Sequence, residues 1–198
     1  LLKKKFGLPL FNPLLISIAV VIVFLAVFDI DYQNYNDGAK YLSYLLTPAT
    51  VCLAIPLYEQ MEALKKNIKA ILAGILSGVL TSLTVVLALA LIFNLNHKMY
   101  VTLLPKSITT ALGGAVTITV AVIIITGVLG NMLAETLCKL FHIEEPIAKG
   151  ISIGSASHAI GTAKAMEMGD VEGAMSSLSI AVAGILTVVG ASIYAMFI

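Results

Sequence analysis

The chain contains no arginine, and all twelve of its basic residues are lysines. An anionic ligand therefore cannot be held by the bidentate fork of a guanidinium group and would need lysine, hydroxyl or backbone donors instead. Only 12% of the residues are charged and the formal net charge is +1. Without a basic patch, the sequence excludes a nucleic-acid partner from the expected functions.

Tryptophan is also absent, and cysteine and histidine are scarce. Cys52 and Cys138 lie in apolar segments and are expected to be small buried side chains, not a disulfide or a metal pair. His97, His142 and His158 are scattered, with no two at helical spacing. Since a metal site needs several convergent ligands, we expect neither a metal nor any other cofactor.

Apolar residues are abundant: 59% of the chain is hydrophobic and its mean hydropathy is +1.01. Predominantly apolar runs cover Pro13–Phe28, Ile68–Phe93, Ala115–Cys138 and Ala174–Ile198. A helix needs about 20 residues to cross a bilayer, and the last three runs reach or approach that length. The sequence therefore predicts an all-α polytopic membrane protein, with residues 1–198 forming a single transmembrane domain.

The order of segments hints at an internal repeat. A helix, a broken polar segment and a second helix are expected within residues 13–93 and again within 115–198. If the two halves start on opposite sides of the membrane, they are inverted repeats, an arrangement that occurs in many secondary transporters. The region after Leu1 resembles a linker that follows a helix, so a further helix is expected before it.

Lysine bias predicts the orientation of the chain in the membrane. The clusters at Lys3–Lys5 and Lys65–Lys69 are expected on the cytoplasmic side, because lysine-rich connections are retained there. Asp29–Lys40, with three aspartates and one lysine, is expected to be a polar loop on the outside.

Lys149–Lys164 is the most informative segment, since it carries three glycines, three serines, a threonine and a histidine between apolar runs. Lipid offers such groups no hydrogen bonds, so irregular polar backbone at membrane depth lines a cavity or is buried in protein. We therefore predict a solute site with a helix broken at Gly150 and Gly154. Its candidate binding residues are Ser155, Ser157, His158, Gly161 and Thr162.

Two other interpretations of this segment remain. One is a helix-packing seam whose serines bond their own backbone four residues back, which accounts for Ser152 and Ser155 but poorly for His158. Catalysis is disfavoured, because a nucleophile elbow needs glycine where His158 stands. Adjacent residues on a helix also point about 100° apart, so Ser157 cannot easily bond His158.

A second candidate site follows Pro105, which is expected to break its helix. After this break a lysine precedes three hydroxyl residues, which suits a carboxylate ligand. Alternatively, the lysine extends to the membrane interface. The residues of this candidate site are Lys106, Ser107, Thr109 and Thr110.

Three remaining expectations concern helix breaks and carboxylates. Pro48 and Pro56 lack backbone donors and are expected to break the apolar segment around them. Glu135 is expected at the membrane interface, and Glu167 in a solvated loop.

At this point several motifs together closely resemble the LrgB/CidB family, in order over nearly the whole chain. They are Asn-Pro-Leu-Leu-Ile at 12–16, Pro-Ala-Thr-Val at 48–51, Pro-Lys-Ser-Ile-Thr-Thr at 105–110, Thr-Gly-Val-Leu-Gly at 126–130 and Ala-Ser-His-Ala-Ile-Gly-Thr-Ala at 156–163. Family members usually have a helix before the Leu1 region. They also have additional residues between the paired threonines and the Gly-Gly pair, whereas here only Ala111 and Leu112 intervene.

The resemblance implies a multi-pass protein of the bacterial inner membrane that pairs with a small LrgA/CidA-type membrane subunit. Family members have been described as antiholin-like modulators of murein hydrolase export and autolysis, and related proteins transport pyruvate, glycolate or glycerate. Two broken polar segments favour transport, because a hole-former that disrupts lipid needs none. We therefore expect a carrier of small monocarboxylates, a homo-oligomer and not an enzyme, with a holin-like regulatory pore as the alternative.

The predicted orientation can be tested by cysteine labelling. In a variant lacking Cys52 and Cys138, a membrane-impermeant thiol reagent added to intact cells should label a cysteine at Gln33 and leave one at Asn67 unlabelled. Equal labelling of both positions from outside would contradict the orientation.

Overall fold

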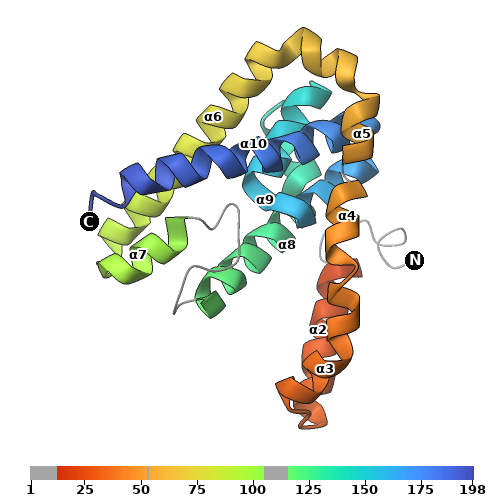
Figure 1. Ribbon diagram of the computed structural model, residues 1–198, viewed down its shortest axis with the longest axis vertical. Helices are drawn as coiled ribbons and strands as arrows, with labels where there is room; N and C mark the ends of the chain where they lie inside the picture. Colours follow the sequence, from red (N-terminus) through yellow and green to blue (C-terminus); the bar gives the residue numbers. More distant parts are fainter. Residues whose placement is uncertain (1–12, 53, 105–115) are drawn as a thin grey trace. The chain divides into compact units, whose positions relative to one another are not determined.

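The computed structural model describes residues 13–52, 54–104 and 116–198 (Figure 1). These residues form helices joined by short connections and contain no strand, so the predicted all-α class is confirmed. The chain divides into two compact units, Leu1–Ile55 and Pro56–Ile198. Their boundary differs from that of the proposed repeat halves, and the repeat stays a prediction.

The first unit contains α2 (Pro13–Val27), α3 (Tyr32–Ser43) and α4 (Leu46–Cys52). Helix α3 corrects the expectation of a loop over Asp29–Lys40. The Asp31 carboxylate caps the helix by accepting a hydrogen bond from the Gln33 backbone N–H at 3.1 Å. An aspartate cap and a lysine in the last turn are ordinary helix signals. The polar composition of this stretch instead indicated a loop, and the helix was therefore missed.

Pro48 and Pro56 both lie in the first turn of a helix, where the missing N–H loses no hydrogen bond. Pro48 is the third residue of α4, and Pro56 is the third residue of α5 (Ala54–Glu59). Around the break before α4, the helices Tyr32–Leu42 and Thr47–Glu59 are bent by 44°. Cys52, expected to be buried, is exposed.

The second unit contains α6 (Met61–Ile92), α7 (His97–Leu103), α8 (Val116–Leu140), α9 (Pro146–Met168) and α10 (Asp170–Tyr194). Helix α6 is kinked at Asn67, whose side-chain amide donates to the Ala63 carbonyl at 3.0 Å. The apolar run that the sequence placed at Ile68–Phe93 begins directly after this kink. The polar first turns of α6 are thereby separated from its membrane-spanning part.

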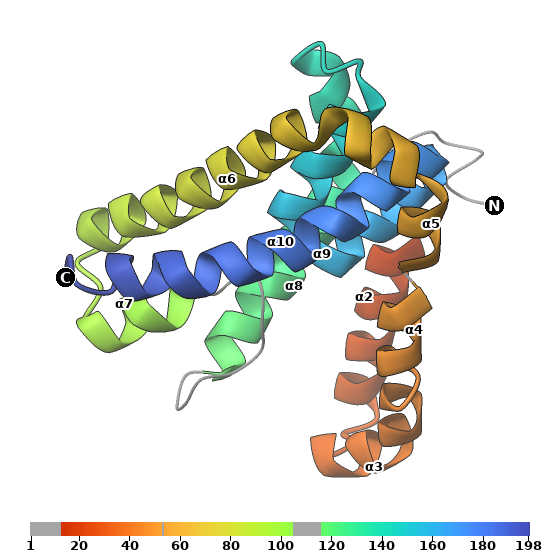
Figure 2. The same cartoon turned by 45° about the horizontal axis from the view of Figure 1, so that its top comes forward.

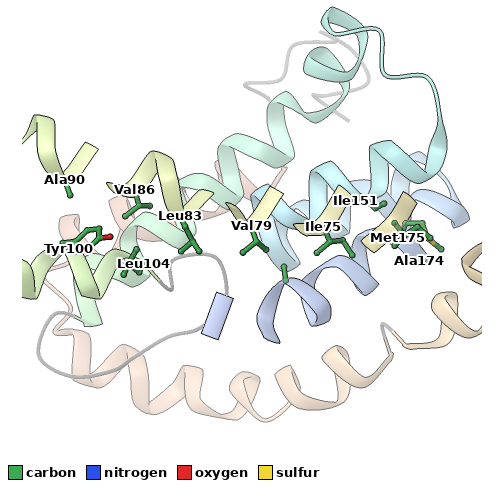
Figure 3. Packing of buried hydrophobic residues seen from close by; sticks show 12 residues of the cluster. Ile75, Val79, Leu83, Val86, Ala90, Tyr100, Leu104, Ile151, Ala174 and Met175 are labelled. Carbon is green, nitrogen blue, oxygen red and sulfur yellow. The ribbon is translucent and has the colours of Figure 1, made fainter. Parts of the chain in front are cut away.

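One face of α6 forms the core of this unit. Its buried residues recur every three or four positions, which places them on a single helical stripe. Figure 3 shows this row with the residues of α7, α9 and α10 that it contacts. The cluster includes Ile71, Ile75, Val79, Leu83, Val86, Ala90, Tyr100, Leu104, Ile151, Ala174, Met175 and Ala183.

The opposite face of α6 is apolar as well. Leu72, Leu76 and Leu80 are each 46% exposed, an outer surface that suits lipid and not water. Within the described residues, three helices are long and apolar enough to cross a membrane, and the bent pair Tyr32–Leu42 and Thr47–Glu59 would add a fourth if it forms one span. The three are Met61–Ile92, Thr119–Leu140 and Asp170–Tyr194.

Helix α9 packs against α6, α8 and α10 (Figure 2). Gly150 and Gly154, which were expected to break this helix, lie within its regular first part. They allow α10 to approach closely: a methyl group at Gly154 would overlap the Ser179 hydroxyl and the Ser176 carbonyl. One at Gly150 would lie 2.5 Å from the Glu172 carbonyl oxygen. These glycines therefore serve helix packing.

Substituting Gly154 by alanine should destabilise the protein by about 1–3 kcal/mol, because the added methyl group must displace backbone as well as side-chain atoms of α10. Gly74→Ala is the matched control, since its methyl group would meet the Ile151 Cγ2 at an ordinary 3.5 Å. Both variants gain the same helix propensity. The free energies of unfolding in detergent measure the difference, and equal stability of the two variants would contradict the packing described.

Candidate functional site

Helix α9 is interrupted at His158, where the backbone adopts φ 49° and ψ −147°. This region of conformational space is close to one that essentially only glycine adopts, and occupying it costs other residues about 1–3 kcal/mol. The interruption confirms that the polar segment is broken, although four residues after Gly154. It divides α9 into a half at 146–157 and a half at 159–168.

Hydroxyl groups tie the break to α10. The Thr162 hydroxyl donates to the His158 carbonyl oxygen at 3.0 Å and lies 2.7 Å from the Ser176 hydroxyl. A hydroxyl has one hydrogen to donate. Because that of Thr162 is directed to His158, Ser176 must be the donor to Thr162. Both side chains are fully buried, so this chain of hydrogen bonds satisfies polar groups that have no access to water.

Helix α8 contacts the other side of the break. The Asn131 side-chain amide donates to the Ile160 carbonyl oxygen at 2.7 Å, and Asn131 is itself buried. The Ser157 side chain packs on Gly130, where a methyl group would overlap its hydroxyl. Three helices therefore surround a buried polar group of Asn131, Ser157, Thr162 and Ser176 beside the His158 break.

Gly161 acts through its small size. A methyl group there would overlap the Ser157 Cβ and lie 3.1 Å from the Ile153 Cγ2. The break thus brings the first turn of the second half-helix against the first half, and any larger residue would separate them. This close approach makes Gly161 a packing residue in the candidate site.

Ser155 does not join this group. Its hydroxyl donates to the Ile151 carbonyl at 2.7 Å, and its side chain faces Gly78 of α6. The packing-seam interpretation therefore fits Ser155, and it also fits Ser152, whose hydroxyl bonds the Lys149 carbonyl at 2.9 Å. The second sequence candidate, Pro105 with Lys106, Ser107, Thr109 and Thr110, lies outside the described residues.

Sequence reasoning missed an ionic cluster next to the break. The Lys164 side chain is only 9% exposed and contacts carboxylates of Glu135 on α8 and Glu167 on α9, the latter at 3.2 Å. Glu167 is thus a helical ion-pair partner, which corrects its expected place in a loop. Glu135 is 48% exposed.

The two contacts between α8 and the second half of α9 share one spacing. Asn131 and Glu135 are one helical turn apart, and so are their partners Ile160 and Lys164. The hydrogen bond from Asn131 and the ion pair of Glu135, one turn apart, therefore both hold the second half-helix against α8. The sequence signal for them was an amide and a carboxylate at i and i+4 within the otherwise apolar Ala115–Cys138 run.

This architecture defines a polytopic α-helical membrane protein with a discontinuous, polar helix buried among apolar ones. The chain matches the LrgB-like family over residues 1–197 and belongs to that family. Curated relatives named Antiholin-like protein LrgB occur in Bacillus mycoides (strain KBAB4), Bacillus cereus (strain B4264) and Bacillus anthracis (strain CDC 684 / NRRL 3495). Each is 38% identical over 206 residues, which cover 100% of this chain and 90% of the relative. No solved structure matches the chain.

The backbone at position 158 provides a test of the break. His158→Gly should be more stable than His158→Ala by about 1 kcal/mol or more, because glycine adopts this conformation without strain. In a regular helix the order reverses, since alanine is favoured over glycine by about 1 kcal/mol. Thermal or denaturant unfolding of the two purified variants in detergent measures the order, and a more stable alanine variant would contradict the break.

Proposed function

We propose that this protein is a secondary carrier of small monocarboxylates, such as pyruvate, glycolate or glycerate, in the bacterial inner membrane. The observation that carries the proposal is the break at His158, because it places an interrupted polar helix and buried hydroxyl groups within an apolar bundle. Discontinuous helices of this kind form the substrate sites of many transporters. A protein that only packs helices together gains nothing from a strained backbone at this position.

The helix that begins after the break suits an anionic ligand. Backbone N–H groups in the first turn of a helix lack partners within that helix, and the helix dipole makes this end positive. The half-helix at 159–168 begins beside the buried polar group. Ser157 lies two residues before it and can supply a hydroxyl donor. A carboxylate with a neighbouring hydroxyl or keto oxygen matches this mixture of donors.

His158 would add a group that changes charge near neutral pH. If its imidazole carries a proton with the substrate, uptake will depend on pH in a way that replacement of His158 alters. We propose in addition that the carrier is homo-oligomeric and works with a small LrgA/CidA-type membrane subunit.

The alternative function is that of an antiholin-like regulator, which the names of the curated relatives favour. Such a protein would modulate murein hydrolase export and autolysis without a solute of its own. The two functions differ in what reconstituted protein does: a carrier saturates with substrate and discriminates among acids, whereas a regulatory pore leaks solutes unselectively. Uptake of labelled pyruvate and glycolate, compared with leakage of a neutral dye from the same proteoliposomes, separates them.

Ser157→Ala should raise the half-saturating pyruvate concentration about 5- to 150-fold, the effect of about 1–3 kcal/mol from a lost buried hydrogen bond to substrate. Ser152→Ala is the matched control, because Ser152 lies on the same half-helix with an exposed side chain. Its uptake should equal that of the unmodified protein. Unchanged uptake by the Ser157 variant at normal protein levels would remove Ser157 from the site, and absent saturable uptake by the unmodified protein would refute the carrier.

A further inference from the structure

The two carboxylate partners of Lys164, Glu135 and Glu167, line an open cleft. We infer that Lys164 receives the substrate carboxylate and releases Glu167 in exchange. This inference rests on the proposed function, since it assigns a cation to the proposed substrate, at the cleft and apart from the donors beside the break.

Lys164 is the one lysine among the described residues whose side chain is buried. A buried ammonium group is strongly destabilising unless carboxylates or other acceptors compensate it. Without arginine in the chain, lysine is the only permanently charged donor for an anion. The position of Lys164 six residues after His158 places this donor in the half-helix that the break creates.

The ammonium group has more carboxylate partners than its charge requires. Glu135 and Glu167 both contact it, so the cluster of three side chains carries a net negative charge. Addition of a substrate carboxylate to this cluster would place three negative groups on one positive group, which like-charge repulsion opposes. If the substrate carboxylate replaces one glutamate, Lys164 still has two carboxylate partners and the repulsion does not increase.

Glu167 is the partner that leaves. Its side chain is 59% exposed, compared with 48% for Glu135, so its carboxylate loses less by returning to water. Its contact with Lys164 spans a single turn of the same helix, and such exposed pairs contribute little to stability. Glu135 meets Lys164 from α8 and remains, keeping the second half-helix in place during the exchange.

An open cleft of about 500 Å³ is available to the exchanged groups. Glu135 and Glu167 both line it, together with Glu144, Glu172, Lys139 and Lys149, whereas Lys164 is not part of the lining. A substrate in the cleft therefore meets Lys164 only in place of one of its two glutamate partners. A water molecule in the liquid occupies about 30 Å³, so the cleft accommodates a three-carbon acid with several waters. Glu135 lies one turn along α8 from Asn131, about 6 Å at 1.5 Å per residue. The residues described around the break do not line the cleft.

Uptake of labelled pyruvate into proteoliposomes by four variants tests the exchange. Lys164→Gln should raise the half-saturating concentration roughly tenfold or more, because a charged donor to the carboxylate is lost, while Lys164→Arg stays within roughly threefold of the unmodified protein. Glu167→Gln should lower the half-saturating concentration, because the competing carboxylate is gone. Lys98→Gln is the control, since Lys98 on α7 has an exposed side chain and does not line the cleft, and it should change nothing.

A lysine that only holds helices together gives a different pattern. In that case Lys164→Gln and Glu167→Gln both weaken pyruvate uptake or lower the yield of folded protein, and either result for Glu167→Gln overturns the exchange. Saturable uptake with an unchanged half-saturating concentration in Lys164→Gln overturns the inference and leaves the carrier function intact. Absence of pyruvate and glycolate uptake by the unmodified protein overturns both.

Discussion

Backbone hydrogen bonding at the His158 break is the constraint on which the second unit depends. An interrupted helix leaves N–H and C=O groups without their usual partners, and neither lipid nor apolar side chains can replace them. Here the replacements come from two neighbours: Asn131 of α8 donates to Ile160, and Thr162 bonds His158 with support from Ser176 of α10. The break can therefore exist only where both neighbouring helices are close.

The close approach of α8 and α10 to α9 depends on glycine and serine residues at the contacts. Gly154 lets α10 reach α9, and Gly130 receives the Ser157 side chain at α8. Small residues are the usual means of close helix approach in membranes, where lipid removes the hydrophobic driving force between helices. In this unit the same small residues also bring hydroxyl groups into contact with the broken backbone. The same contacts between α9 and its neighbours therefore provide both the helix packing and the hydrogen bonds of the break, so a substitution there alters both.

Sequence reasoning succeeded where a pattern had one physical meaning. The run Ile68–Phe93 predicted a spanning helix because a helix that crosses the bilayer is the one structure that accommodates so long an apolar stretch. It failed for α3, because a polar sequence such as this one is compatible with a short capped helix as well as with a loop. The location of the break also escaped it, because Gly150 and Gly154 are equally suited to breaking a helix and to packing one. Asn131 and Lys164 became visible only when the fold brought distant helices together.

The kink at Asn67 sets the length of the segment that must be matched to the bilayer. From Ile68 to Ile92 the helix extends about 37 Å at 1.5 Å per residue, longer than the roughly 30 Å hydrocarbon layer of a typical membrane. Such hydrophobic mismatch is relieved by tilting the helix or thickening the lipid around it. Because α10 packs along α6, the two must tilt together. Acyl-chain length is thus a variable that sets the inclination of the pair in any reconstituted membrane.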